Sequence, residues 1–191
     1  MRCLSCHRLS IATFCKLCHK KLLQPTITKR TVNGLEVYSF FKYQHIQDLL
    51  LTKHTPQGFK VYKALARLSF KLFMQNFLKN SHSKVYLLGV DEQVKSGYSH
   101  VALLTHSMQD KRVTVLHSKL MAKNSVKYAG KSLDYRLKNP RNFTYSGVNN
   151  IEVILIDDII TTGTTLKEAK EVLAKQKVEV LFALTLVDVE V

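Results

Sequence analysis

The sequence predicts an α/β domain with a mostly parallel sheet flanked by helices, preceded by a small module built on four cysteines. Three observations support this fold class. From residue 85 onward, strand-like runs alternate with helix-like runs, which is typical of a parallel sheet. A β-rich apolar run at 151–156 leads through two acids and a threonine-rich turn into a helix. All four cysteines lie within residues 3–18.

The individual elements follow from hydrophobic periodicity. Short apolar and β-branched runs predict strands at 85–90, 112–117, 151–156 and 178–187. Apolar positions at helical spacing predict helices at 59–78, 98–108 and 164–177, with a shorter amphipathic run at 46–51. Pro25 and Gly34 mark 25–36 as a connector. We therefore divide the chain into a cysteine module with its connector at 1–36 and one domain at 37–191.

The chain is strongly basic, and its positive charge is unevenly distributed. It has 29 Lys and Arg against 14 Asp and Glu, a formal net charge of +15. Residues 1–150 hold 25 basic and six acidic residues, whereas residues 151–191 hold four and eight. Such a field attracts polyanions, which include nucleic acid, anionic lipid headgroups and phosphorylated small molecules. A solvated basic surface without a dedicated partner is the alternative.

Two features of the sequence concern its location. No apolar stretch of the roughly 7–15 residues expected of a secretory signal precedes Cys3. No apolar run approaches the roughly 18–20 residues that a membrane-spanning helix needs. We expect a cytoplasmic protein, and any role at the inner membrane would be that of a peripheral protein.

The cysteines are arranged as two CxxC pairs, Cys3 with Cys6 and Cys15 with Cys18. Two such turns can supply the four sulfurs of a tetrahedral zinc site. A segment of this size has too little core to fold alone, so metal binding would supply its folding energy. Two disulfides, an iron–sulfur cluster and a redox CxxC are the alternatives; a reducing compartment disfavours the disulfides. We predict structural zinc, with His7 and His19 as bystanders.

Residues 153–166 hold the most informative pattern in the chain. A buried strand ends in Asp157 and Asp158, and a turn rich in hydroxyls, with Gly163 at its centre, leads into a helix. This order places N–H groups and hydroxyls at a helix N-terminus, where anions bind. Two carboxylates at the strand end are well placed to accept hydrogen bonds from a vicinal diol. The alternative is that the threonines serve only as helix caps.

This stretch resembles the signature of the type I phosphoribosyltransferases, in which two apolar residues precede Asp-Asp-x-x-Thr-Thr-Gly-x-Thr. The resemblance implies that domain 37–191 has the type I phosphoribosyltransferase-like fold and binds phosphoribosyl pyrophosphate (PRPP), with Mg²⁺ arriving bound to PRPP. It assigns Asp157 and Asp158 to the ribose hydroxyls. It assigns the 5′-phosphate to Thr161, Thr162, Gly163, Thr164 and Thr165.

Over nearly its full length the chain is similar to the ComF/ComFC competence proteins, which combine a four-cysteine zinc finger with such a domain. Arg136 and Asn139 match an Arg-x-x-Asn stretch of that family, whereas Tyr128 stands in place of a glutamine. Gly97 and Tyr98 match the region of the pyrophosphate loop, but Ser96 replaces its usual arginine. Glu92 adds an acid there, and Lys95 compensates in part. The ribose-phosphate side of the site therefore matches the family better than the pyrophosphate side.

The resemblance implies a cytoplasmic factor for natural transformation, which helps single-stranded DNA cross the inner membrane and binds both PRPP and that DNA. Other competence proteins, such as a helicase or a translocation channel, would be its partners. The alternatives are an active phosphoribosyltransferase acting on a nucleobase and a PRPP-sensing regulator that binds DNA. Basic residues near the zinc knuckles and within 111–141 are the candidate DNA contacts: Lys16, Lys20, Lys21, Lys119, Lys123 and Lys127.

Overall fold

The computed structural model describes residues 1–81, 83–90, 97–126, 128 and 130–189. Its strands are β1 (Thr28–Val32), β2 (Leu35–Lys42), β3 (Val85–Gly89), β4 (Val113–Val115), β5 (Leu120–Ala122), β6 (Phe143–Tyr145), β7 (Ile151–Ile160) and β8 (Val178–Asp188). Its helices are α1 (Lys16–Lys21), α2 (Tyr43–Leu50), the 3-10 turn η1 (Leu51–His54), α3 (Pro56–Leu68), α4 (Phe70–Asn80), α5 (His100–His106), α6 (Leu133–Lys138) and α7 (Thr164–Lys175).

Six of the strands form one sheet in the order β1-β2-β8-β7-β3-β4. The neighbours from β2 to β4 are all parallel, and only β1 pairs in the antiparallel sense, with β2. Strands β5 and β6 form a separate antiparallel pair. The mostly parallel sheet flanked by helices is therefore confirmed. Within the described residues, no helix is both long enough and apolar enough to span a bilayer.

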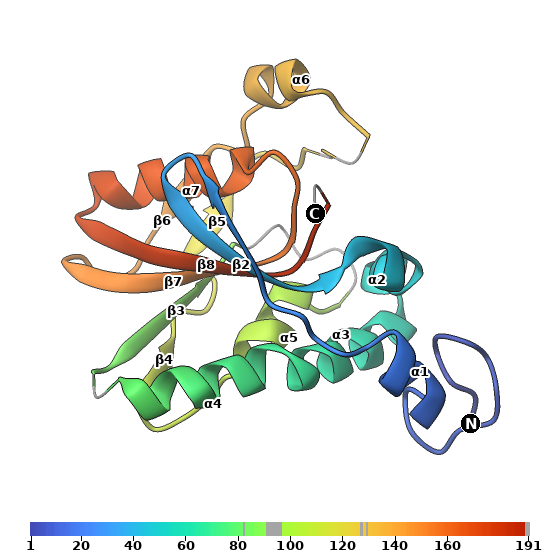
Figure 1. The fold of residues 1–191 in the computed structure, drawn as a ribbon. Coiled ribbons are helices and arrows are strands. Elements are labelled where there is room, and N and C mark those ends of the chain that lie inside the picture. The colour runs from blue at the N-terminus through green and yellow to red at the C-terminus, as the bar shows by residue number, and fades with distance from the viewer. Residues whose placement is uncertain (82, 91–96, 127, 129, 190–191) are drawn as a thin grey trace.

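The sheet has a different cover on each face, as Figure 1 shows. Helices α3, α4 and α5 lie against one face, and α7 lies against the other. Because side chains alternate along a strand, β7 supplies both cores. Ile154 and Ile156 pack with α3, α4 and α5, whereas Val153 and Leu155 pack with α7 and the β5–β6 pair.

The helical pattern at 59–78 forms two helices, α3 and α4, that meet at Ser69. The Ser69 hydroxyl donates to the Leu65 carbonyl at 2.8 Å, and the Ser69 backbone leaves the helical region with φ −120° and ψ −78°. A serine that bonds back to the carbonyl four residues earlier often bends a helix. At the other end of α3, Thr55 caps the helix by accepting from the Gly58 N–H at 3.2 Å.

Residues 28–36, which lie in the predicted connector, belong to the β1–β2 hairpin at the edge of the main sheet. The turn consists of Asn33 and Gly34, with φ +51° and +69°. Positive φ at both positions is what a two-residue hairpin turn requires, and Asn-Gly is the pair that favours it. The hairpin brings Arg30 and Val32 beside the loop that follows β7.

The cysteine module lies beside α2 and the start of α3, at the right of Figure 1. Its buried side chains belong to the same hydrophobic cluster as these helices; they are Cys3, Phe14, Cys18 and Leu23. The module thus shares its apolar contacts with the domain that follows it.

Candidate functional site

The loop between β7 and α7 lies at the carboxyl end of the parallel sheet. Gly163 in this loop has φ +74°, and a Cβ there would lie 2.2 Å from Val32 Cγ1. Both the left-handed backbone and the close approach of β1 therefore require glycine. Gly163 is also the N-cap of α7, so in the described chain no side chain caps this helix. The first N–H groups of α7 are directed toward the loop. The alternative that the threonines of this loop serve only as helix caps is not supported.

Asp158 points away from the loop, into the layer formed by α3 and α5. It continues the alternating series of Ile154 and Ile156, and it is buried. Its Oδ2 accepts hydrogen bonds from Tyr62 Oη at 3.1 Å and Lys53 Nζ at 3.3 Å. The Nε2 atom of His100 lies 3.4 Å from the same oxygen.

The surroundings of Asp158 determine its charge. Burial opposes ionisation, but the positive charges of His100 and Lys53 and the hydrogen bond from Tyr62 hold the pKa of Asp158 well below its usual range. Burial, together with the charge of Asp158, raises the pKa of Tyr62 well above its usual value. At neutral pH the carboxylate is therefore an anion and Tyr62 a neutral hydrogen-bond donor.

Asp157 belongs to the opposite face of β7 and is only half-buried. Its Oδ1 accepts a hydrogen bond from the backbone N–H of Asp158 at 2.8 Å. The strand therefore separates the two adjacent acids that the sequence analysis treats as one pair. Asp157 lies beside the loop, and Asp158 joins β7 to the helical layer.

Two arginines converge on Thr161, the first residue of the loop. Arg30, from β1, donates to the Thr161 carbonyl, and its Nε lies 2.8 Å from Asp188 Oδ2. Arg136, from α6, donates to the hydroxyl of Thr161 and lies 3.4 Å from that of Thr162. Sequence reasoning missed Arg30, because 131 positions separate it from Thr161; Arg136 was indicated only by the family resemblance.

The segment around α6 is folded rather than extended. Tyr128 is buried, and the guanidinium groups of Arg141 and Arg136 lie 4.7 and 5.5 Å from the centre of its ring. Glu168 of α7 accepts from the backbone N–H groups of Arg141 at 3.1 Å and Asn142 at 2.6 Å. The ring of Tyr128 is therefore occupied by protein contacts and does not offer a stacking surface for a nucleic-acid base.

The region that resembles the pyrophosphate loop is described only in part. Glu92, Lys95 and Ser96 lie outside the described residues. Beyond them, the Tyr98 hydroxyl donates to the Lys53 carbonyl at 2.6 Å, and Ser99 caps α5. His100, at the start of α5, is thereby positioned next to Asp158.

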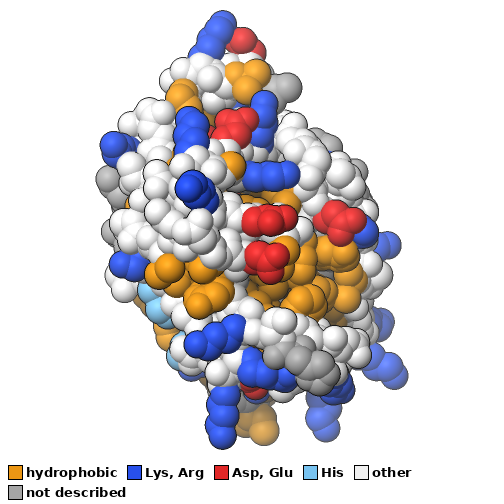
Figure 2. Space-filling view, turned by 90° about the vertical axis from the view of Figure 1, so that its left-hand side faces the viewer, with side chains coloured by type: hydrophobic (Ala, Val, Ile, Leu, Met, Phe, Trp, Pro, Cys, Tyr) orange, Lys and Arg blue, Asp and Glu red, His pale blue; other side chains and the backbone are white. Residues whose placement is uncertain are grey.

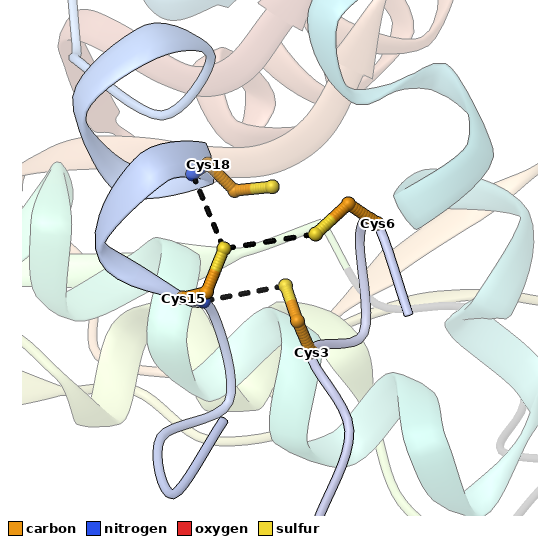
Figure 3. Close-up of side chains that lie close together, drawn as sticks. All are labelled: Cys3, Cys6, Cys15 and Cys18. Carbon is orange, nitrogen blue, oxygen red and sulfur yellow. Dashed lines mark hydrogen bonds between the residues drawn. The ribbon is translucent and has the colours of Figure 1, made fainter. Parts of the chain in front are cut away.

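The four cysteines come together as the sequence analysis expects (Figure 3). Their Sγ atoms all lie within 4.8 Å of one another, and those of Cys6 and Cys15 are 3.6 Å apart. Four sulfurs at a Zn–S distance of about 2.3 Å form a tetrahedron whose edges are about 3.8 Å. The donor set and its spacing therefore fit a four-thiolate metal ion.

The thiols differ in how readily they ionise. Burial disfavours the Cys3 thiolate, but backbone N–H groups of Cys6, Cys15 and Ser5 outweigh this effect and lower the pKa of Cys3 to about 6. Burial raises the pKa of Cys18 to about 12. A bound metal ion would hold all four as thiolates.

The candidate DNA contacts are spread over two parts of the molecule. Lys16, Lys20 and Lys21 are exposed on α1, whereas Lys119 and Lys123 are exposed on either side of β5. Figure 1 shows α1 and β5 well apart. Lys127 lies outside the described residues.

We predict one zinc ion per chain. Cys3→Ser or Cys18→Ser should lose the metal and unfold the module, because each removes one ligand of four and both cysteines are buried. Elemental analysis of protein purified without chelator measures the stoichiometry, and His19→Ala, which spares the sulfurs, should retain the metal. A metal content near zero in the wild-type protein would contradict the assignment.

We predict that Asp158 makes folding sensitive to acid. Its folded pKa is depressed, so its stabilisation is complete above the unfolded pKa of about 3.9 and is lost as the pH falls through and below that value. Between about pH 5 and pH 3, the unfolding free energy of the wild type should fall more steeply than that of Asp158→Asn, by at most about 1.4 kcal/mol per pH unit.

Urea titrations at several pH values measure these slopes. Glu179→Gln, which removes an exposed carboxyl group, should keep the wild-type slope. Parallel slopes for the wild type and Asp158→Asn would show that Asp158 ionises alike in the folded and unfolded chains.

Comparison with known proteins relates part of the chain to one family model. Residues 99–190, just under half of the chain, match the family model described as phosphoribosyl transferase domain. No curated protein sequence matches the chain. The matched segment contains the β7–loop–α7 unit together with Arg136 and His100.

Several solved phosphoribosyltransferases are similar at low identity. A hypoxanthine phosphoribosyltransferase from Staphylococcus aureus is 21% identical over 66% of this chain and 64% of its own, with a TM-score of 0.43. An orotate phosphoribosyltransferase from Mycobacterium tuberculosis is 14% identical over 90% and 82%, with a TM-score of 0.41. An adenine phosphoribosyltransferase from Leishmania donovani is 13% identical over 91% and 68%, with a TM-score of 0.42.

The chain thus spans less than two thirds of the length of the S. aureus protein. The family match over 99–190, the parallel sheet and the strand–loop–helix unit together show a phosphoribosyltransferase-like fold, with a four-cysteine cluster at its N-terminal end.

Proposed function

We propose that the chain binds PRPP at the loop after β7, with the 5′-phosphate in residues 161–165 and the ribose diol at Asp157. The observation that carries this proposal is the β7–loop–α7 unit, which combines an uncapped helix N-terminus with a left-handed glycine. Ligands of open α/β sheets bind outside the carboxyl ends of the strands, and this loop lies at such an end.

The chemistry of the loop suits a phosphate group. The N–H groups in the first turn of α7 and the dipole of this helix favour an anion. The hydroxyls of Thr162 and Thr164 lie 2.9 Å apart, close enough to donate to one phosphate. Mg²⁺ would arrive bound to the pyrophosphate of PRPP, and Asp157 offers the carboxylate oxygen that this ion prefers.

Asp158 differs from Asp157 because its carboxylate is already bonded within the protein. To accept hydrogen bonds from the ribose diol, its carboxylate would have to give up its contacts with Tyr62, Lys53 and His100. We therefore propose that Asp157 makes the direct contact and that Asp158 holds the end of β7 in place.

Active phosphoribosyl transfer is the alternative to binding alone. Transfer needs groups that stabilise the departing pyrophosphate. Ser96 stands where the family usually has an arginine, and residues 91–96 lie outside the described residues. Release of pyrophosphate from PRPP in the presence of nucleobases would favour a working enzyme.

We predict that Asp157→Ala weakens PRPP binding. A hydrogen bond to a charged group contributes about 1.5–3 kcal/mol, so affinity should fall roughly tenfold or more. Calorimetry with PRPP and Mg²⁺ measures the change. Glu179→Ala, at an exposed acid away from the loop, should bind like the wild type. Equal affinities of wild type and Asp157→Ala would refute the assignment.

We further propose that the chain is a competence factor, which binds single-stranded DNA during its uptake. The family resemblance supports this role, and so do the net charge of +15 and the exposure of the lysines beside α1 and β5. On the face drawn in Figure 2, Lys and Arg occupy mainly the periphery, while acidic and apolar side chains fill the centre. That face is therefore not the basic surface that such a proposal requires.

We predict sequence-independent binding of single-stranded DNA that weakens steeply with salt. Each phosphate contact contributes about −0.7 to the log–log slope, and we expect a total steeper than about −2. One variant replaces Lys16, Lys20 and Lys21 with Gln, and a second replaces Lys119 and Lys123. The variant whose salt slope becomes shallower identifies the lysines that contact DNA. Cells that carry the variant with the shallower slope should also internalise less DNA.

Fluorescence anisotropy with labelled oligonucleotides at several salt concentrations measures these slopes. A shallow slope, or no binding near physiological salt, would contradict a direct role in DNA binding.

A further inference from the structure

Several contacts hold Arg136 against the loop that we propose to bind the 5′-phosphate. Its Nε donates to the Lys131 carbonyl at 3.2 Å, and one Nη donates to the Tyr128 carbonyl at 3.1 Å. The other Nη meets the hydroxyls of Thr161 and Thr162. The ring of Tyr128, 5.5 Å from the guanidinium carbon, supports the group from one side.

The charge of Arg136 differs from that of the other arginine at this loop. Arg30 is paired with Asp188 at 2.8 Å, so its charge is neutralised within the protein. The contacts of Arg136 within the described chain are to uncharged oxygens and to an aromatic ring. Among the described residues, a half-buried guanidinium with no carboxylate partner thus lies against the hydroxyls of the loop that we propose to bind the phosphate.

We propose that Arg136 is a ligand of the 5′-phosphate and selects sugars that carry this group. Its Nε and one Nη are bonded to backbone carbonyls. The other Nη, which faces Thr161 and Thr162, would donate to a phosphate oxygen in a charge-assisted hydrogen bond. The inference rests on the proposed PRPP site and adds a residue to it from outside the loop. Arg30 acts as a positioning residue, because it holds the Thr161 carbonyl while its own charge is satisfied by Asp188.

We assign Arg136 to the 5′-phosphate of PRPP and not to its pyrophosphate. The basic segment 111–141 could have served only to hold the departing anion, but Arg136 lies at Thr161 and Thr162, which belong to the loop assigned to the 5′-phosphate. Ribose 5-phosphate and inorganic pyrophosphate each carry one of the two anionic ends of PRPP. They are therefore the probes that distinguish the two roles.

The experiment is calorimetry of the full-length chain with ribose 5-phosphate, PRPP and pyrophosphate. Arg136→Gln should lose roughly tenfold or more in affinity for the first two ligands, as expected for a lost charge-assisted pair, and should bind pyrophosphate like the wild type. Arg136→Lys, which keeps the positive charge but not the planar guanidinium, should lose less affinity for these two ligands.

Lys138→Gln is the matched control. Lys138 lies on the same helix and pairs with Asp134 at 3.0 Å, so this variant removes one positive charge without touching the loop. Equal affinities of Arg136→Gln and Lys138→Gln for ribose 5-phosphate would overturn the proposal. A loss confined to pyrophosphate and PRPP would also overturn it.

A second measurement uses the wild-type chain and does not depend on how a variant folds. Phenylglyoxal modifies accessible guanidinium groups, and mass spectrometry locates the modified peptide. Ribose 5-phosphate should protect Arg136 and pyrophosphate should not; the reverse pattern would contradict the proposal. If the wild type bound neither PRPP nor ribose 5-phosphate, the proposed function itself would fail. If the wild type bound both and Arg136→Gln bound them equally well, only the role of Arg136 would fail.

Discussion

The buried carboxylate of Asp158 is the constraint on which the candidate site depends. One oxygen of this group meets Tyr62 of α3, Lys53 of η1 and His100 of α5, so a single charge joins three elements to the end of β7. An anion in this position is tolerated because positive charges and a hydroxyl surround it; removing one partner of such a buried cluster typically costs about 3–5 kcal/mol. The helical layer and the loop after β7 are therefore held in a fixed relation.

The opposite face of β7 carries the groups that we propose to contact the ligand. The alternation of the strand places Asp157 on that face, and Gly163 lets the chain turn into α7 beside Val32. Arg30 and Arg136 approach Thr161 from β1 and α6. Residues from an edge hairpin, a central strand and the segment before β6 thus meet at one loop, and only the folded sheet brings them together.

The cysteine module depends on the same core. Cys3 and Cys18 are buried in the cluster that also contains residues of α2 and α3, so a metal ion bound by the four sulfurs would fix a surface of the main domain as well as the module. This arrangement explains how a short segment that buries few of its apolar side chains, with Met1, Leu9, Ile11 and Leu17 all exposed, becomes an ordered part of the molecule.

The sequence by itself determined the features that are local. The four-cysteine cluster and the β7–loop–α7 unit each depend on a short run of residues, whose spacing and periodicity report directly on a metal site or on a strand, turn and helix. The tertiary structure decided which side chains complete the site. Tyr62 reaches Asp158 across 96 positions, and Arg30 reaches Thr161 across 131. Such contacts arise from how the helices and the hairpin pack on the sheet, and local periodicity carries no information about that packing.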